Sequence, residues 1–120
     1  MELLIKRVYD EPDPGDGFRV LVDRLWPRGL TKERARLDLW AKDVAPSTEL
    51  RRAFHHGGMT WEDFAAAYRA ELAADPAVAA LRDDLAPHPV ATLLHSVADA
   101  TQNHAVLLRE ALEAGAPRSA

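Results

Sequence analysis

The sequence predicts an α/β domain in which helices flank a short, mostly parallel sheet, in Rossmann-like layers. Three apolar runs are short enough to be strands, at residues 3–8, 18–25 and 90–97. The apolar residues in the later two are nearly continuous, which is typical of strands buried on both faces of a parallel sheet. Segments with helical periodicity lie between the second and third runs and after the third. Helices alternating with such strands indicate an α/β architecture.

The first two strands are separated by a turn-rich loop. The strand Leu3–Val8 leads into residues 10–17, where Pro and Gly break regular structure. The strand Phe18–Leu25 is rich in β-branched and apolar residues. Pro27 and Gly29 then end it.

Helix signals follow in the middle of the chain. Thr31 is a predicted N-cap for a short charged turn, whereas residues 37–44 fit neither helix nor strand clearly. Pro46-Ser47 begins a helix that Gly57-Gly58 ends. A capping-box pattern begins the next helix at Thr60. The predicted apolar stripe of that helix is Trp61, Phe64, Ala65, Tyr68 and Leu72.

The remaining elements are two helices and one strand. Asp75-Pro76 begins a helix with proline at its first position. The strand Val90–Val97 follows, and the final helix ends at Gly115. We expect residues 1–115 to form a single domain and residues 116–120 to be frayed. The apolar stripes of the two helices are predicted to be Val78, Leu81 and Leu85, and Ala105, Leu108, Ala111 and Leu112.

Composition is that of an ordinary soluble protein of one domain. Of 120 residues, 48% are hydrophobic and 28% are charged, and the net charge is −4. The lack of cysteine excludes disulfides, thiolate nucleophiles and thiolate metal ligands. No stretch is apolar enough to span a membrane and no secretory signal opens the chain, so we expect a cytoplasmic protein. The sequence does not predict an oligomeric state.

Charge is unevenly distributed along the chain. Residues 17–42 carry seven basic and three acidic side chains, whereas six basic and eleven acidic side chains follow from residue 43 onward. This asymmetry is either an ordinary solvated surface or a local basic patch for an anionic small molecule. Nucleic-acid-binding domains are usually basic overall, so nucleic acid is not favoured as a partner.

The segment Asp23–Gly29 is the strongest candidate for a binding site. It places a carboxylate, an indole and two guanidinium groups directly after an apolar strand. Arg24 and Arg28 can each offer a planar pair of donors to a phosphate or carboxylate, and Trp26 could form the wall of a pocket. The alternatives are structural: the arginines pair with acids or stack on tryptophan, and Asp23 caps a turn or orients an arginine.

A second polar cluster, at residues 95–104, follows the third strand. Ligands of parallel sheets bind outside the carboxyl ends of the strands, so we expect the two clusters to face one cleft. Ser96 and Asn103 are then candidate ligand-binding residues. His104 and Asp23 are candidate catalytic residues, since histidine titrates near neutral pH. The start of the last helix is a further candidate anion site. A serine-hydrolase triad is not favoured, because no G-x-S-x-G motif occurs.

We predict neither a metal nor a cofactor. His55 and His56 are adjacent, and adjacent side chains of a helix point about 100° apart, so they rarely share one metal. No H-x-x-x-H or H-E-x-x-H spacing occurs. The alternative is a metal site assembled from scattered side chains, namely Asp23, His95, Asp99 and His104.

Four segments resemble the YeaO-like proteins, the family called domain of unknown function 488. The segments are Lys6–Asp10, Asp16–Gly29, Ala45–Arg51 and Thr101–Ala105. The string Asp-Arg-Leu-Trp-Pro-Arg-Gly is the most specific part, and the resemblance covers roughly residues 2–113. It implies a compact α/β domain and no assigned activity.

Larger relatives in that family are similar in one feature and differ in another. They have a strand that ends in Asp-Val-Arg followed by a proline, and here Asp23-Arg24 and Pro27 resemble it. They also carry cysteines after a late strand, where Ser96 and Asn103-His104 stand in this chain. The resemblance therefore implies that thiol chemistry is absent here, while the geometry for binding an anion could survive.

Two functions remain open at this point, and the sequence does not decide whether the protein is an enzyme. The first is a small enzyme or binding domain with a cleft for a phosphorylated or carboxylated small molecule. The second is a non-enzymatic regulatory or interaction domain that docks a partner through an Arg/Trp surface. Convergence of Arg24, Arg28 and His104 in a concave pocket favours the first, whereas a flat exposed face favours the second.

Overall fold

A computed structural model of the chain describes residues 1–114. Four parallel strands form one sheet in the order β1-β4-β2-β3. The strands are β1 (Glu2–Arg7), β2 (Phe18–Leu21), β3 (Leu39–Trp40) and β4 (Val90–His95). The predicted α/β class is confirmed. The predicted helix end at Gly115 and the predicted frayed tail, residues 116–120, lie outside the described residues.

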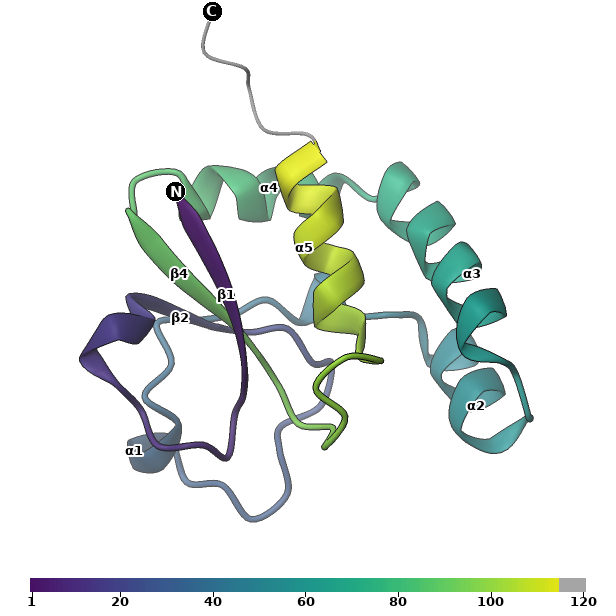
Figure 1. The fold of residues 1–120 in the computed structure, drawn as a ribbon, viewed down its shortest axis with the longest axis horizontal. Helices are drawn as coiled ribbons and strands as arrows, with labels where there is room; N and C mark the ends of the chain where they lie inside the picture. Colours follow the sequence, from purple (N-terminus) through teal and green to yellow (C-terminus); the bar gives the residue numbers. More distant parts are fainter. Residues whose placement is uncertain (115–120) are drawn as a thin grey trace, which may run out of the picture.

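Most helices pack on one face of this sheet (Figure 1). The helices in the described part of the chain are α1 (Lys32–Ala35), α2 (Thr48–His56), α3 (Trp61–Ala74), α4 (Pro76–Leu85) and α5 (His104–Ala114). The main core joins α2, α3, α4 and α5 to Leu3, Val20, Val22, Ala91 and Leu93 on the sheet side. Figure 1 shows α5 between the strands and α3. No helix within residues 1–114 is long and apolar enough to cross a membrane.

The other face of the sheet carries a smaller core and a buried ion pair. Val8, Leu21 and Leu94 form that core. Arg19 is only 5% exposed; its guanidinium contacts the Asp16 carboxylate and donates to the carbonyl of Ala35 at 2.8 Å. This guanidinium is satisfied inside the protein, so it adds little free positive charge to the surface.

The predicted helix starts are confirmed by their caps. The side-chain oxygens of Thr31, Ser47, Thr60 and Asp75 each accept a hydrogen bond from a backbone N–H in the first turn that follows. Each cap satisfies one of the donors that a helix start leaves free. Of the unassigned residues 37–44, two form β3 and three form a 3-10 turn.

Two strands end earlier than the sequence predicts. β2 ends at Leu21 rather than Leu25, and β4 ends at His95 rather than Val97. The backbone N–H of Val22 still bonds to Leu94, but beyond it the N–H of Ser96 bonds to the Asp23 side chain instead of to a neighbouring strand. Where the polar clusters begin, the Asp23 carboxylate therefore takes the place of a neighbouring strand as the hydrogen-bond acceptor.

The predicted apolar stripes are mostly buried. In α3, Phe64, Ala65, Tyr68 and Leu72 are buried, and the predicted stripe of α4 is buried in full. Trp61 is only half-buried and stacks on Phe64 with ring centroids 5.5 Å apart. In α5, Ala111 is half-buried and Leu107 takes a place in the core beside the predicted residues.

We predict that Gly17→Ala destabilises the protein more than Gly58→Ala does. Both glycines have positive φ, 62° and 75°, so either alanine costs about 1–2 kcal/mol. At Gly17 a Cβ would also overlap the backbone carbonyl of Val90, whereas at Gly58 it meets nothing within 4 Å. The overlap is expected to add about 1–3 kcal/mol. Urea denaturation of both variants measures the difference, and equal losses would contradict the close approach of Gly17 to β4.

Candidate functional site

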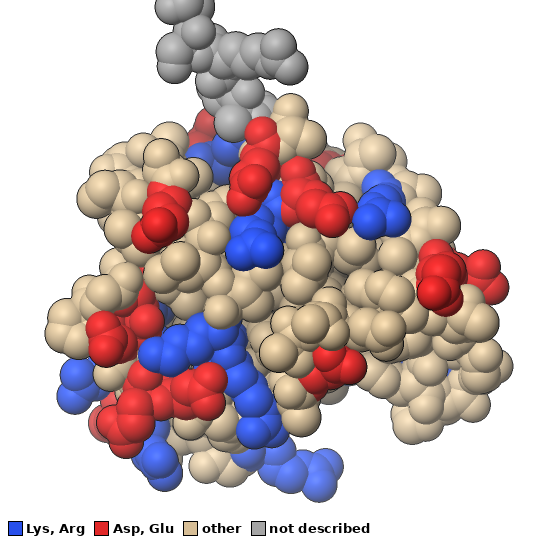
Figure 2. Space-filling model, in the orientation of Figure 1, with Lys and Arg blue, Asp and Glu red and all other residues tan. Residues whose placement is uncertain are grey.

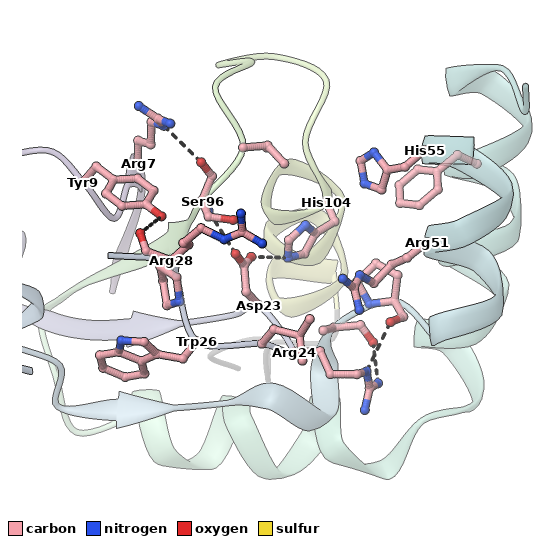
Figure 3. Close-up of a pocket in the computed structure, with 16 residues that line it drawn as sticks. Arg7, Tyr9, Asp23, Arg24, Trp26, Arg28, Arg51, His55, Ser96 and His104 are labelled. Carbon is pink, nitrogen blue, oxygen red and sulfur yellow. Dashed lines mark hydrogen bonds and ion pairs between the residues drawn. The ribbon is translucent and has the colours of Figure 1, made fainter. Parts of the chain in front are cut away.

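A cavity of about 590 Å³ lies at the carboxyl ends of β1, β2 and β4 (Figure 3). Part of its lining comes from the ends of these strands and the chain just after them. These residues are Arg7, residues 23–28 and residues 96–97. Another part of the lining comes from helices, through His104 of α5 and Arg51 of α2. The two polar clusters of the sequence therefore face one cavity.

Asp23 lies at the centre of this arrangement. Its Oδ2 accepts a hydrogen bond of 3.0 Å from the backbone N–H of Ser96, and its Oδ1 lies 3.2 Å from Nε2 of His104. Burial by itself would raise the pKa of Asp23, but the His104 imidazole and the bonds from Ser96 outweigh it and hold the pKa below its ordinary value. Asp23 is consequently ionised at neutral pH, and its charge is compensated within the protein.

His104 is fixed by two acceptors on the same ring nitrogen. Its Nε2 lies 2.9 Å from the carbonyl oxygen of Val22 as well as near Asp23. Both neighbours only accept, so Nε2 carries a hydrogen. The Tyr68 ring contacts the imidazole edge to face, with centroids 6.1 Å apart. His104 lines the cavity, and its Nδ1 makes no hydrogen bond within residues 1–114.

Four arginines line the cavity, and two of them are partly tied to the backbone. Arg24 donates from Nη2 to Ala45 at 3.2 Å and from Nε to Pro46 at 3.5 Å, which connects the segment after β2 to the start of α2. Arg7 donates from Nε to the carbonyl of Ser96 at 3.0 Å. These contacts fix both side chains without neutralising their charge.

The side chains of the other two arginines, Arg28 and Arg51, make no hydrogen bond or ion pair with any residue of the described chain. Arg28 is held through its backbone, because its carbonyl accepts a 2.8 Å hydrogen bond from the Tyr9 hydroxyl. Figure 3 shows its side chain reaching toward the Asp23–His104 pair. Arg28 and Arg51 thus bring unpaired guanidinium groups to the cavity wall.

The structure places most of the predicted site residues on this wall. The predicted residues that line the cavity are Asp23, Arg24, Trp26, Arg28, Ser96 and His104. The indole N–H of Trp26 donates to Leu30 at 2.7 Å, so only the face and edge of the ring remain for contact.

Asn103 does not line the cavity. It is buried below α5, where its amide nitrogen donates to Asp99 at 2.9 Å and its Oδ1 accepts from the N–H of Val106 at 3.2 Å. The N–H groups of Thr101 and Gln102 both bond to the Asp99 carboxylate. The N–H groups of Thr101, Gln102 and Val106 are therefore occupied within the chain, and the anion site expected at the start of the last helix stays a prediction.

The sequence analysis missed residues on two other elements. Arg7 ends β1 and Tyr9 follows it at the same edge of the sheet, so the argument used for Asp23 also applies to them. Arg51 and His55 come from α2, and nothing local marks them as cavity residues. Burial, followed by the nearby charge of Arg51, lowers the pKa of His55, so this imidazole is neutral at neutral pH.

The arrangement does not resemble a hydrolase triad or a metal centre. The Ser96 hydroxyl makes no hydrogen bond with His104 in the described structure, and Asp99 is exposed and bonded to the turn at residues 101–102. Within residues 1–114, no three His, Asp or Glu side chains are grouped so that they could hold a metal ion. The chemistry that the wall offers is anion recognition next to one carboxylate–imidazole pair.

Comparison with known proteins identifies relatives that have no assigned function. A family model described as "Inactive DUF488-N3 subclade" matches residues 2–120. The chain is 46% identical over 110 residues to uncharacterized protein YeaO of Escherichia coli K12, covering 92% of this chain and 96% of that protein. It is 43% identical over 108 residues to uncharacterized protein Rv3073c of Mycobacterium tuberculosis H37Rv, covering 90% and 91%. No solved structure matches the chain.

We predict that Asp23→Asn removes an acid-sensitive part of the stability. The folded pKa of Asp23 lies below its ordinary 3.8, so the carboxylate contributes stability that is present above that value and is lost as the pH falls through the folded pKa. At neutral pH the substitution is expected to cost about 1–3 kcal/mol. Urea denaturation at several pH values should show the wild type and the variant converging in acid.

Asp83→Asn is the matched control for this experiment. Asp83 is exposed and has no hydrogen bond or ion pair within the described residues, so its substitution changes the same charge without removing the contacts at the strand ends. We expect the stability of Asp83→Asn to fall with decreasing pH in the same way as that of the wild type. A constant gap between wild type and Asp23→Asn at all pH values would contradict the assignment.

Proposed function

The chain belongs to the DUF488 family of YeaO-like proteins, and we propose that it binds an anionic small molecule, phosphorylated or carboxylated, in the cavity at the carboxyl ends of its strands. The observation that carries this proposal is the charge of the wall. Four arginines line the cavity, but Asp23 is the only carboxylate there. The wall therefore has an excess of three positive charges, four minus one, when the histidines are neutral.

This excess is local, because the whole chain has a net charge of −4. Figure 2 shows basic side chains gathered toward the lower edge of the molecule beside several acidic ones, and both kinds of side chain over the rest of this face. A concave wall of one charge sign concentrates the electric field and attracts counter-ions. Positive charge gathered in a cavity of a negative protein supports a role in binding a small anion.

Unpaired guanidinium groups support the same conclusion. The planar donor pair of arginine matches the geometry of a phosphate or carboxylate. Arg28 and Arg51 bring this donor pair to the cavity with no acceptor of the described chain occupying it. Asp23 is held by His104 and the Ser96 N–H, and its negative charge is already subtracted in the excess of three positive charges.

We infer binding rather than turnover. Asp23 and His104 form the only carboxylate–imidazole pair of the cavity within residues 1–114 and are the candidates for acid–base chemistry. The matching family model is described as inactive, which favours a role in which this pair shapes the site. His104 would then present Nδ1 to the ligand as a hydrogen-bonding group.

The alternative function is a docking surface for a partner protein. Leu25 is 64% exposed and Trp40 is 37% exposed, and exposed apolar side chains of this kind occur at protein interfaces. The arginines and His104, however, line a concave cavity. Concave sites with a few convergent polar groups are typical of small-molecule binding, so the cavity argues for the first function.

We predict that Arg28→Ala weakens the binding of phosphorylated small molecules by about tenfold or more, because two charge-assisted hydrogen bonds are lost. The measurement is the increase in melting temperature with inorganic phosphate and a set of phosphorylated metabolites. Arg52→Ala is the control, since Arg52 is an exposed arginine on α2 that does not line the cavity. Equal ligand-induced shifts in both variants would remove Arg28 from the site, and no shift in any protein would contradict anion binding.

A further inference from the structure

We propose that the ligand carries two acidic groups joined by a short organic spacer, one bound by Arg28 and the other by Arg51. This inference rests on the proposed function and specifies its ligand class. Arg28 comes from the segment after β2 and Arg51 from α2. Figure 3 shows the two side chains approaching from opposite sides, with His104 between them.

The positions of both walls are fixed by contacts within the protein. The Arg51 wall is held because Ser47, the N-cap of α2, donates from its N–H and its hydroxyl to the Glu71 carboxylate at 2.9 and 2.7 Å. Arg24 bonds to the carbonyls of residues 45 and 46 and so connects this wall to the segment that carries Arg28. Two anchored walls define a spacing that a ligand must match.

Because His104 lies between the two arginines in Figure 3, we expect a single acidic group to reach only one of them. Neither Arg28 nor Arg51 has an acceptor in the described chain, and like charges on facing walls repel each other. A ligand with two acidic groups offsets both charges at once. The wall's excess of three positive charges offsets most or all of the charge of such a ligand, which runs from about −2 for two carboxylates to between about −3 and −4 for two phosphates.

The apolar part of the cavity lining suits an organic spacer. Leu25, Pro46, Phe64 and Val97 contribute apolar surface to the cavity. The volume of about 590 Å³ lies within the range of small-molecule sites, about 300–1,000 Å³. Apolar surface between charged ends suits a few carbon atoms that separate two phosphates, two carboxylates, or one of each.

The test compares two probes that differ only in their number of acidic groups, propane-1,3-diphosphonate and propylphosphonate, by isothermal titration calorimetry. We expect the diphosphonate to bind the wild type at least about tenfold more tightly. Arg51→Gln should abolish this preference and leave propylphosphonate binding unchanged. Arg28→Gln should weaken both probes, and Arg51→Lys should restore part of the preference.

Arg52→Gln is the control for general electrostatics, because it removes the same charge from the neighbouring position, outside the cavity. It should leave the preference intact. Two results would overturn the proposal of two acidic groups and leave anion binding in place. In the first, both probes bind equally well to the wild type. In the second, Arg51→Gln and Arg52→Gln reduce the preference for the diphosphonate to the same extent. If neither probe binds and melting curves show all proteins folded, both proposals are overturned.

Discussion

The carboxylate of Asp23 joins three parts of the chain that the sequence keeps far apart. It accepts the N–H of Ser96, 73 residues away, and contacts His104 at the start of α5. The side chain is only 12% exposed, and a buried carboxylate is tolerated only when it is paired and hydrogen-bonded. The ends of β2 and β4 and the position of the imidazole therefore depend on one ionised group, and so does the geometry of the cavity built around it.

The cavity is positive because four arginines on its wall outnumber that one carboxylate. Arg7 and Arg24 are held by backbone carbonyls, which fix a guanidinium but do not neutralise it. Arg28 and Arg51 have no acceptor in the described chain. At functional sites, proteins commonly leave polar or charged groups without a partner inside the protein. Here those groups are the two arginines without partners, which lie on parts of the chain held by other contacts. This pattern is the physical basis for proposing a small anionic ligand.

The sequence predicted the features that depend on local chemistry. Caps at Thr31, Ser47 and Thr60 require only nearby residues, and the structure has all of them. The strand ends were placed too late, because Asp23 takes over the Ser96 N–H through a tertiary contact that no local pattern reveals. Arg51 was missed for the same reason: the packing of α2, which brings it to the cavity, is encoded in contacts such as that of Ser47 with Glu71.

The central claim is that an anion binds between Arg28 and the Asp23–His104 pair. Two-dimensional NMR of the arginine Nε–Hε groups and the His104 ring during titration with propane-1,3-diphosphonate tests it most directly. The account predicts saturable shifts of the Arg28, Arg51 and His104 signals with one common dissociation constant, and an unmoved signal for Arg52. Shifts confined to arginines outside the cavity, or a uniform drift of all arginine signals without saturation, would contradict it.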